Sequence, residues 1–169
     1  MRSFLNWVYA AAEFLAAVCM VGVLISVLLS ILSRQLEFHI SGLDAYAGYF
    51  MASAGFLALA STLRHGEHIR VTLVLNALAP AGKRRLDIAA LLVGTAIAAS
   101  LAIFSTKLVL DSYTFNDIST SNDATPLWIP QLGMLVGNVL LLIAFIDLLV
   151  GRIRGDESGM DAQEQQRHE

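Results

Sequence analysis

The stretch FLAAVCMVGVLISVLLSILS, residues Phe14–Ser33, decides the fold of this chain. It is 20 residues long and contains no charged side chain. Three further stretches are also free of charge: Ala45–Leu63, Ile88–Thr106 and Ala124–Ile146. About 20 apolar helical residues cross the hydrocarbon core of a bilayer, and a water-facing helix of that length would carry a charged stripe. The sequence therefore predicts an all-α integral membrane protein with four transmembrane helices.

Composition agrees with one small membrane domain. Hydrophobic residues make up 56% of the 169 residues and charged residues only 15%, against about 25% charged in soluble domains. We expect a four-helix domain over residues 1–151 and a polar, disordered cytoplasmic tail over 152–169. No basic patch is large enough to indicate nucleic-acid binding. The expected transmembrane spans are 12–33, 45–63, 87–107 and 128–149.

Basic residues predict the orientation. Eight of them fall at the N-terminus, between spans two and three, or directly after span four: Arg2, Arg64, Arg70, Lys83, Arg84, Arg85, Arg152 and Arg154. The opposite side has only Arg34 and, at a helix end, Lys107. Because cytoplasmic loops carry the excess of Lys and Arg, both termini are predicted to be cytoplasmic.

The segment between spans two and three predicts a short interfacial amphipathic helix over residues 68–79. Its apolar residues share one helical face, and they are Val71, Val74, Leu75 and Leu78. The alternative, a continuation of span two, is disfavoured because Arg64, Glu67 and Arg70 interrupt it. Pro80 and Gly82 end the helix. The basic run Lys83, Arg84 and Arg85 then lies at the level of the lipid headgroups, where it is a candidate anchor to anionic lipid.

Few residues suggest chemistry. Glu13 stands just before the first charge-free stretch, and an interfacial carboxylate is favoured over the alternative, a self-contained proton-coupled exporter that uses Glu13. Asn138 lies deeper, where its amide is suited to a hydrogen bond between helices. The four histidines lie outside the spans, which disfavours a haem-bearing anchor of a redox complex. No enzymatic motif is present, so we expect neither catalysis nor a cofactor or metal.

Small residues recur at helical spacing in three spans. Ala90, Gly94, Ala98 and Ala102 follow one another every four residues, Gly133 and Gly137 form a GxxxG pattern, and Gly48, Ala52 and Ser53 line part of span two. Close backbone approach through such residues is what joins helices in lipid. Four helices carry many such faces, so we expect packing both within the chain and against a partner.

Three motifs, in order, carry a resemblance to a known family over roughly residues 5–150. They are Ser33-Arg34-Gln35, Gly66-Glu67-His68-Ile69-Arg70-Val71, and the stretch Ser121–Gly137 with Pro126, Trp128 and Pro130. The chain resembles the small membrane subunit, of the DctQ type, of tripartite ATP-independent periplasmic (TRAP) transporters. It departs from the family pattern at Leu43, before Asp44, where the family often has an aromatic residue.

The resemblance implies a supporting role in the bacterial inner membrane. A periplasmic binding protein of the DctP type would deliver a carboxylate substrate, and a large DctM-type subunit would move it by symport with an ion. The small subunit would scaffold the large one without holding substrate. Candidate partner-interface residues are Arg34, Asp44, Glu67, His68, Arg70, Trp128, Pro130, Gly133 and Gly137.

Overall fold

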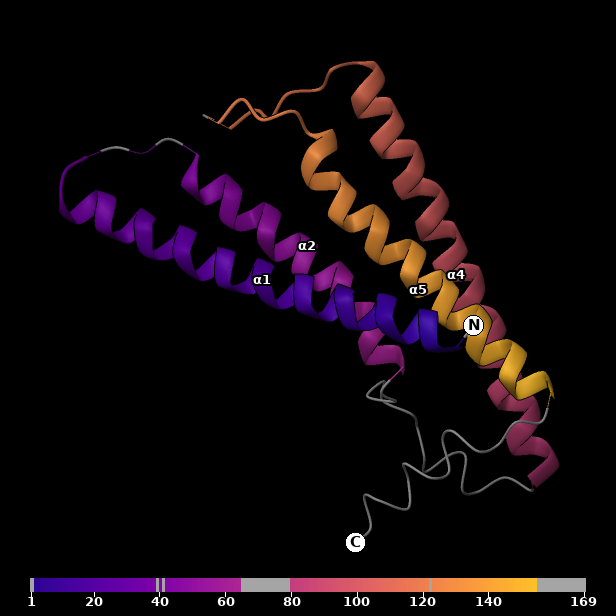
Figure 1. The fold of residues 1–169 in the computed structure, drawn as a ribbon. Coiled ribbons are helices and arrows are strands. Elements are labelled where there is room, and N and C mark those ends of the chain that lie inside the picture. The colour runs from indigo at the N-terminus through magenta and orange to yellow at the C-terminus, as the bar shows by residue number, and fades with distance from the viewer. Residues whose placement is uncertain (1, 39, 41, 65–79, 122, 155–169) are drawn as a thin grey trace, which may run out of the picture.

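The computed structural model describes residues 2–38, 40, 42–64, 80–121 and 123–154 (Figure 1). Within this part the chain is all-α, apart from an isolated antiparallel bridge between Ile118 and Pro126. The helices are α1 (Arg2–Gln35), α2 (Leu43–Arg64), α4 (Pro80–Thr114) and α5 (Trp128–Arg154). The predicted fold class, an all-α protein with four membrane-spanning helices, is confirmed.

Each of the four helices is long and apolar enough to cross a membrane. The candidate spans are Leu5–Gln35, Leu43–Leu63, Arg85–Thr114 and Trp128–Ile153. Two of them have 30 or more residues and so reach about 45 Å at 1.5 Å per residue, against a hydrocarbon core of about 30 Å. These helices therefore tilt in the membrane or extend past the hydrocarbon core.

The predicted interfacial helix over 68–79 lies outside the described residues, as does the tail from residue 155. The description resumes at α4, whose first residue is Pro80. Proline suits this position, because the first N–H groups of a helix have no intrahelical partner. The basic run Lys83–Arg85 consequently belongs to the beginning of α4.

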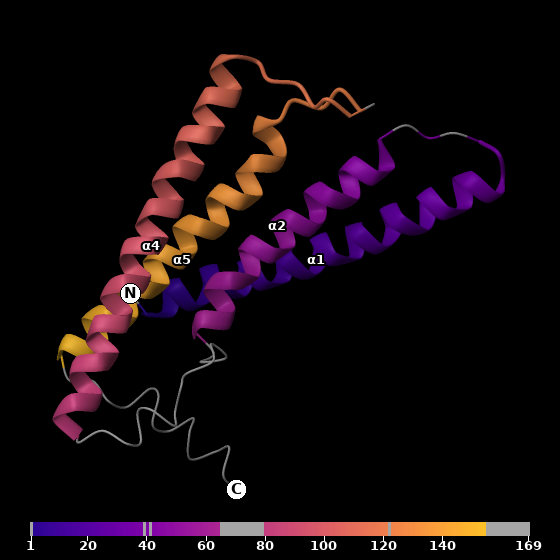
Figure 2. The same cartoon turned by 180° about the vertical axis from the view of Figure 1, so that it is seen from behind.

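The helices form a row in the order α1, α2, α5, α4, because the extensive contacts are α1–α2, α2–α5 and α4–α5. Figures 1 and 2 show two hairpins, α1–α2 and α4–α5, that splay apart as a V. The open end holds the connections between the helices of each hairpin, and we call it the loop end. The other end holds the start of α1 and the end of α5, and we call it the terminal end.

The buried core lies where α1, α2 and α5 converge. Its members are Tyr9, Ala12, Ala16, Leu57, Ala60, Leu140 and Ala144. Most of these side chains are small, which lets helix backbones approach closely where lipid supplies no hydrophobic drive between helices. Only 17–22% of the most apolar window in each span is buried. The chain therefore leaves most of its apolar surface open.

Glycines set the closest helix contacts. A Cβ at Gly133 of α5 would lie 2.3 Å from Ser53 Oγ of α2, and one at Gly137 would lie 2.4 Å from the backbone carbonyl of Phe56. On α4, a Cβ at Gly94 would lie 2.4 Å from the ring of Phe145. The GxxxG pattern of span four thus packs on α2 inside the chain.

Candidate partner-binding site

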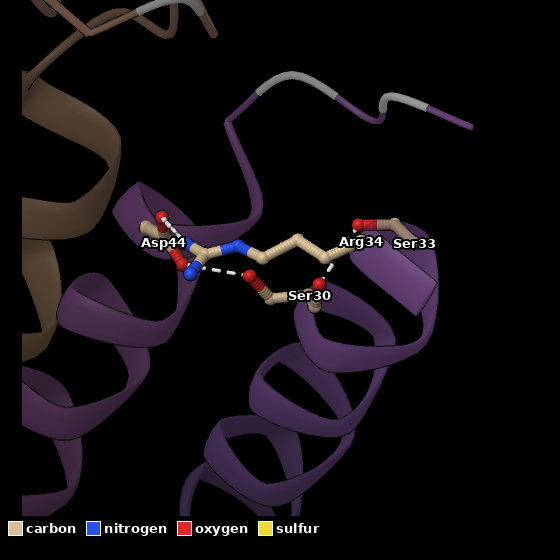
Figure 3. A network of polar contacts seen from close by, with 4 residues as sticks. All are labelled: Ser30, Ser33, Arg34 and Asp44. Carbon is tan, nitrogen blue, oxygen red and sulfur yellow. Dashed lines mark hydrogen bonds and ion pairs between the residues drawn. The ribbon is translucent and has the colours of Figure 1, made fainter. Parts of the chain in front are cut away.

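An ion pair joins the two helix ends of the first hairpin. Arg34 lies in the last turn of α1 and Asp44 in the first turn of α2, where the helix dipoles favour a cation and an anion respectively. Arg34 Nη2 lies 3.6 Å from Asp44 Oδ2. Ser30 Oγ donates to Asp44 Oδ1 at 2.9 Å, and Ser33 Oγ donates to the Ser30 carbonyl at 2.9 Å (Figure 3). Two candidate residues from the sequence are therefore brought together.

This pair is open to solvent. The side chains of Arg34 and Asp44 are 77% and 78% exposed, and exposed pairs contribute only about 0–1 kcal/mol to stability. A hollow of about 330 Å³ lies beside them, and its lining includes Ser121 from the α4–α5 connection. The site thus presents a guanidinium, a carboxylate and hydroxyls to an outside molecule. Rearranging these groups would lower the free energy of unfolding only slightly.

The α4–α5 connection is fastened to α2 at the loop end. Tyr49 Oη lies 2.8 Å from Ser119 Oγ and 3.2 Å from Asp123 Oδ2, within hydrogen-bond reach of both. Gly42 has a φ of +87°, and a Cβ there would lie 2.6 Å from the Asp123 Cβ. Both the backbone angle and the close approach require glycine. This fastening links the splayed hairpins across the open end of the V.

Asp123 makes this fastening dependent on pH. Partial loss of solvent acts to raise its pKa, but hydrogen bonds from Thr125, Ser119, its own backbone N–H and Tyr49 hold the pKa below the usual 3.8. Because this pKa is lower in the folded protein than in the unfolded chain, ionised Asp123 stabilises the folded state. This stabilisation is complete above about pH 4 and is lost as the pH falls through the lowered pKa.

We expect the connection to stay fastened from pH 8 to pH 5 and to loosen only below about pH 4. The emission of Trp128, measured in a Trp7→Phe background, should show this acid step. Asp123→Asn should remove the step. A transition centred near neutral pH would contradict the assignment.

The other candidate residues occupy different settings. Trp128 stacks edge-on against Tyr113, with ring centroids 5.8 Å apart, where α4 ends and α5 begins. Pro130 follows in the first turn of α5 and is half-buried. Gly133 and Gly137 face α2 rather than the outside. These four do not join the Arg34–Asp44 pair.

For several candidate residues the structure does not describe the side chain. Glu67, His68 and Arg70 lie outside the described residues. Lys83 and Arg84 are placed only as part of helix α4, whereas Arg85 is exposed. Among the described residues, no group of three His, Cys, Asp or Glu side chains is arranged to hold a metal ion.

Sequence reasoning did not find the ion pair between Asp87 of α4 and Arg152 of α5. Their Oδ2 and Nη2 atoms lie 2.5 Å apart, with the side chains 14% and 13% exposed. Residues at the start of α4 and at the end of α5 lie at matched depth in antiparallel helices, so the pairing becomes recognisable once these two helices are known to be neighbours. Asn138, in contrast, makes the interhelical bond that its position suggests, since its Nδ2 donates to Ser105 Oγ at 2.6 Å.

Four long apolar helices in a row place the chain among small multi-pass membrane proteins. Residues 23–155 match the DctQ component of the tripartite ATP-independent periplasmic transporters, and the chain belongs to this family. No individual curated protein matches it. Membership implies a small, non-enzymatic subunit of a TRAP transporter in the inner membrane. It also implies partnership with a large DctM-type subunit and a periplasmic binding protein.

Proposed function

We propose that this chain is a static scaffold for the large transport subunit during ion-gradient-driven uptake of a carboxylate. The periplasmic binding protein delivers that substrate, and this chain does not hold it. The supporting observation is the row of helices, held together through small residues, with about four fifths of each apolar window unburied. Such a row presents a wide apolar surface that a larger membrane protein can use as a frame.

The positions of the polar groups in the helices agree with a scaffold. Three of the charge-free stretches fall inside candidate spans, and the fourth, Ala124–Ile146, overlaps the span Trp128–Ile153 from Trp128 onward. Glu13 of α1, the residue on which the exporter alternative depends, accepts a hydrogen bond from Ser61 of α2. A carboxylate used in this way holds two helices together, which suits a fixed frame better than a carrier.

The same proposal sets the terminal end in the cytoplasm. The start of α1, the end of α2, the start of α4 and the end of α5 all lie at that end (Figures 1 and 2). They carry or border most of the basic residues, which supports a cytoplasmic location. Lys83, Arg84 and Arg85 would then contact anionic headgroups. The loop end, with Arg34 and Asp44, would face the periplasm, where the binding protein acts.

Co-purification tests this proposal. We expect an affinity-tagged copy of this chain, co-expressed with its cognate large subunit, to bring that subunit through detergent purification and size-exclusion chromatography as one complex. An unrelated four-helix membrane protein with the same tag serves as the control. Separate elution of the two chains at micromolar concentration would refute the scaffold role.

A further inference from the structure

A second hollow, of about 400 Å³, lies between α2, α4 and α5. Its apolar lining comes from all three helices and consists of Phe56, Leu101, Phe104, Leu108 and Met134. On α4 two charged members, Lys107 and Asp111, lie toward the loop end, whereas Leu101 and Phe104 lie deeper. The two remaining members, Ser105 and Asn138, are hydrogen-bonded to each other. The hollow is therefore amphipathic along its length.

The charged end of this hollow lies at the depth of the lipid headgroups. The span Arg85–Thr114 has 30 residues and is about 45 Å long, against about 30 Å for the hydrocarbon core and about 40–45 Å for the whole bilayer. Lys107 and Asp111 precede the end of this span by about 10 Å and about 5 Å respectively. In a centred span, Asp111 lies in the headgroup layer. Lys107 lies near the hydrocarbon boundary, from which its long side chain reaches the headgroups.

Neither charge is paired among the described residues. The ion pairs in that part of the chain include neither Lys107 nor Asp111, and both residues are exposed. They are four residues apart with the cation first, which is the less favourable order for a pair along one helix. Asp111 also lies in the last turn of α4, which has no basic side chain, and the helix dipole disfavours an anion there. An outside cation on Asp111 and an outside anion on Lys107 would therefore both be stabilising.

We propose that this hollow binds one molecule of phosphatidylethanolamine, with its phosphate on Lys107, its ammonium on Asp111 and an acyl chain against the apolar lining. In this lipid the phosphate lies nearer the acyl chains and the ammonium lies farther out. Asp111 is about 6 Å farther toward the loop end than Lys107, so the two side chains follow the same order.

The headgroup and the class of occupant follow from the same chemistry. A primary ammonium donates charge-assisted N–H bonds to a carboxylate, whereas the quaternary ammonium of phosphatidylcholine has no N–H. Phosphatidylglycerol would bring no cation to Asp111. A lipid is favoured over a helix of the large subunit, because one lipid molecule combines both required charges with an apolar chain in the order that the hollow presents them.

Native mass spectrometry of the full-length chain tests this site. The chain, purified in a mild detergent, is incubated with equal amounts of phosphatidylethanolamine, phosphatidylcholine and phosphatidylglycerol that carry the same acyl chains. We expect phosphatidylethanolamine to be retained at least fivefold over each of the others. Equal retention of all three would indicate boundary lipid without a specific site and would overturn the proposal.

Substitutions assign the two charges. Asp111→Asn should bring retention of the three lipids within twofold of one another, because it removes the partner of the ammonium. Lys107→Gln should lower retention of all three at least threefold, because each has a phosphate. Asp117→Asn neutralises an exposed acid of the α4–α5 connection that does not line the hollow, and it should leave the preference unchanged. Circular dichroism should show equal helix content in all variants. An unchanged preference in Asp111→Asn, or wild-type retention in Lys107→Gln, would contradict the site.

The complex with the large subunit distinguishes a lipid from a partner helix. We expect the co-purified complex to retain phosphatidylethanolamine with the same preference as the chain alone. Retention by the chain alone, with loss from the complex, would show that the large subunit fills the hollow and would overturn the proposal. The lipid preference of the chain alone is measured separately from co-purification, so failure of the scaffold function and failure of the lipid site are distinguishable.

Discussion

Replacing Gly137 with alanine is expected to destabilise the chain by about 3 kcal/mol. The added Cβ would lie 2.4 Å from both the carbonyl carbon and the carbonyl oxygen of Phe56. These are backbone atoms of α2 and cannot move aside as a flexible side chain can. Overpacking of a close contact costs about 1–3 kcal/mol, and a backbone clash belongs at the top of that range. The free energy of unfolding can be measured by SDS titration in mixed micelles.

Gly151 provides the matched control on the same helix. A Cβ at this position would meet nothing within 4 Å, and alanine favours a helix over glycine by up to about 1 kcal/mol. Gly151→Ala should therefore be neutral or slightly stabilising. Equal effects of the two substitutions would show that Gly137 does not set the approach of α2 and α5.

The second large effect is expected at the ion pair between α4 and α5. Arg152→Met would leave the Asp87 carboxylate, 14% exposed, without its cation. Breaking a fully buried pair by removal of one partner costs about 3–5 kcal/mol, because an uncompensated charge stays buried. The Asp87–Arg152 pair is partly buried, so we expect a loss at the lower end of that range. The same SDS titration should show this loss at neutral pH.

Two comparisons make the ion-pair prediction sharp. Asp87→Leu combined with Arg152→Met should recover most of the lost stability, because an apolar pair requires no desolvation of charge. Asp44→Asn, in the exposed pair with Arg34, should change stability by about 1 kcal/mol or less. A large effect at Asp44, or no recovery in the double variant, would contradict the assignment of Asp87–Arg152 as the partly buried pair and Arg34–Asp44 as the exposed one.

The helices could be predicted from the sequence because a long charge-free stretch has few stable alternatives in a cell. The family resemblance was also available from motifs near Arg34 and Trp128, and the family match over residues 23–155 confirms it. Asn138 was identified as a link between helices because an amide at that depth needs a partner.

The order of the helices could not be predicted, because the sequence offered more small-residue faces than the chain uses. Gly133 and Gly137 pack on α2, but Gly48 has open space around it, and nothing in its local sequence distinguishes it from them. The Asp87–Arg152 pair was missed for a related reason. Its partners are 65 residues apart, and they are recognised as partners only when α4 and α5 are known to be neighbours.

Uptake into proteoliposomes tests the central claim, that this chain is a scaffold for the large subunit and does not itself transport substrate. Vesicles would contain this chain alone, the large subunit alone, or both, with the binding protein and an imposed ion gradient. The scaffold account predicts uptake only when both membrane subunits are present, and uptake within about twofold of wild type for Glu13→Gln. Transport by this chain alone, abolished by Glu13→Gln, would contradict the account and support the self-contained exporter.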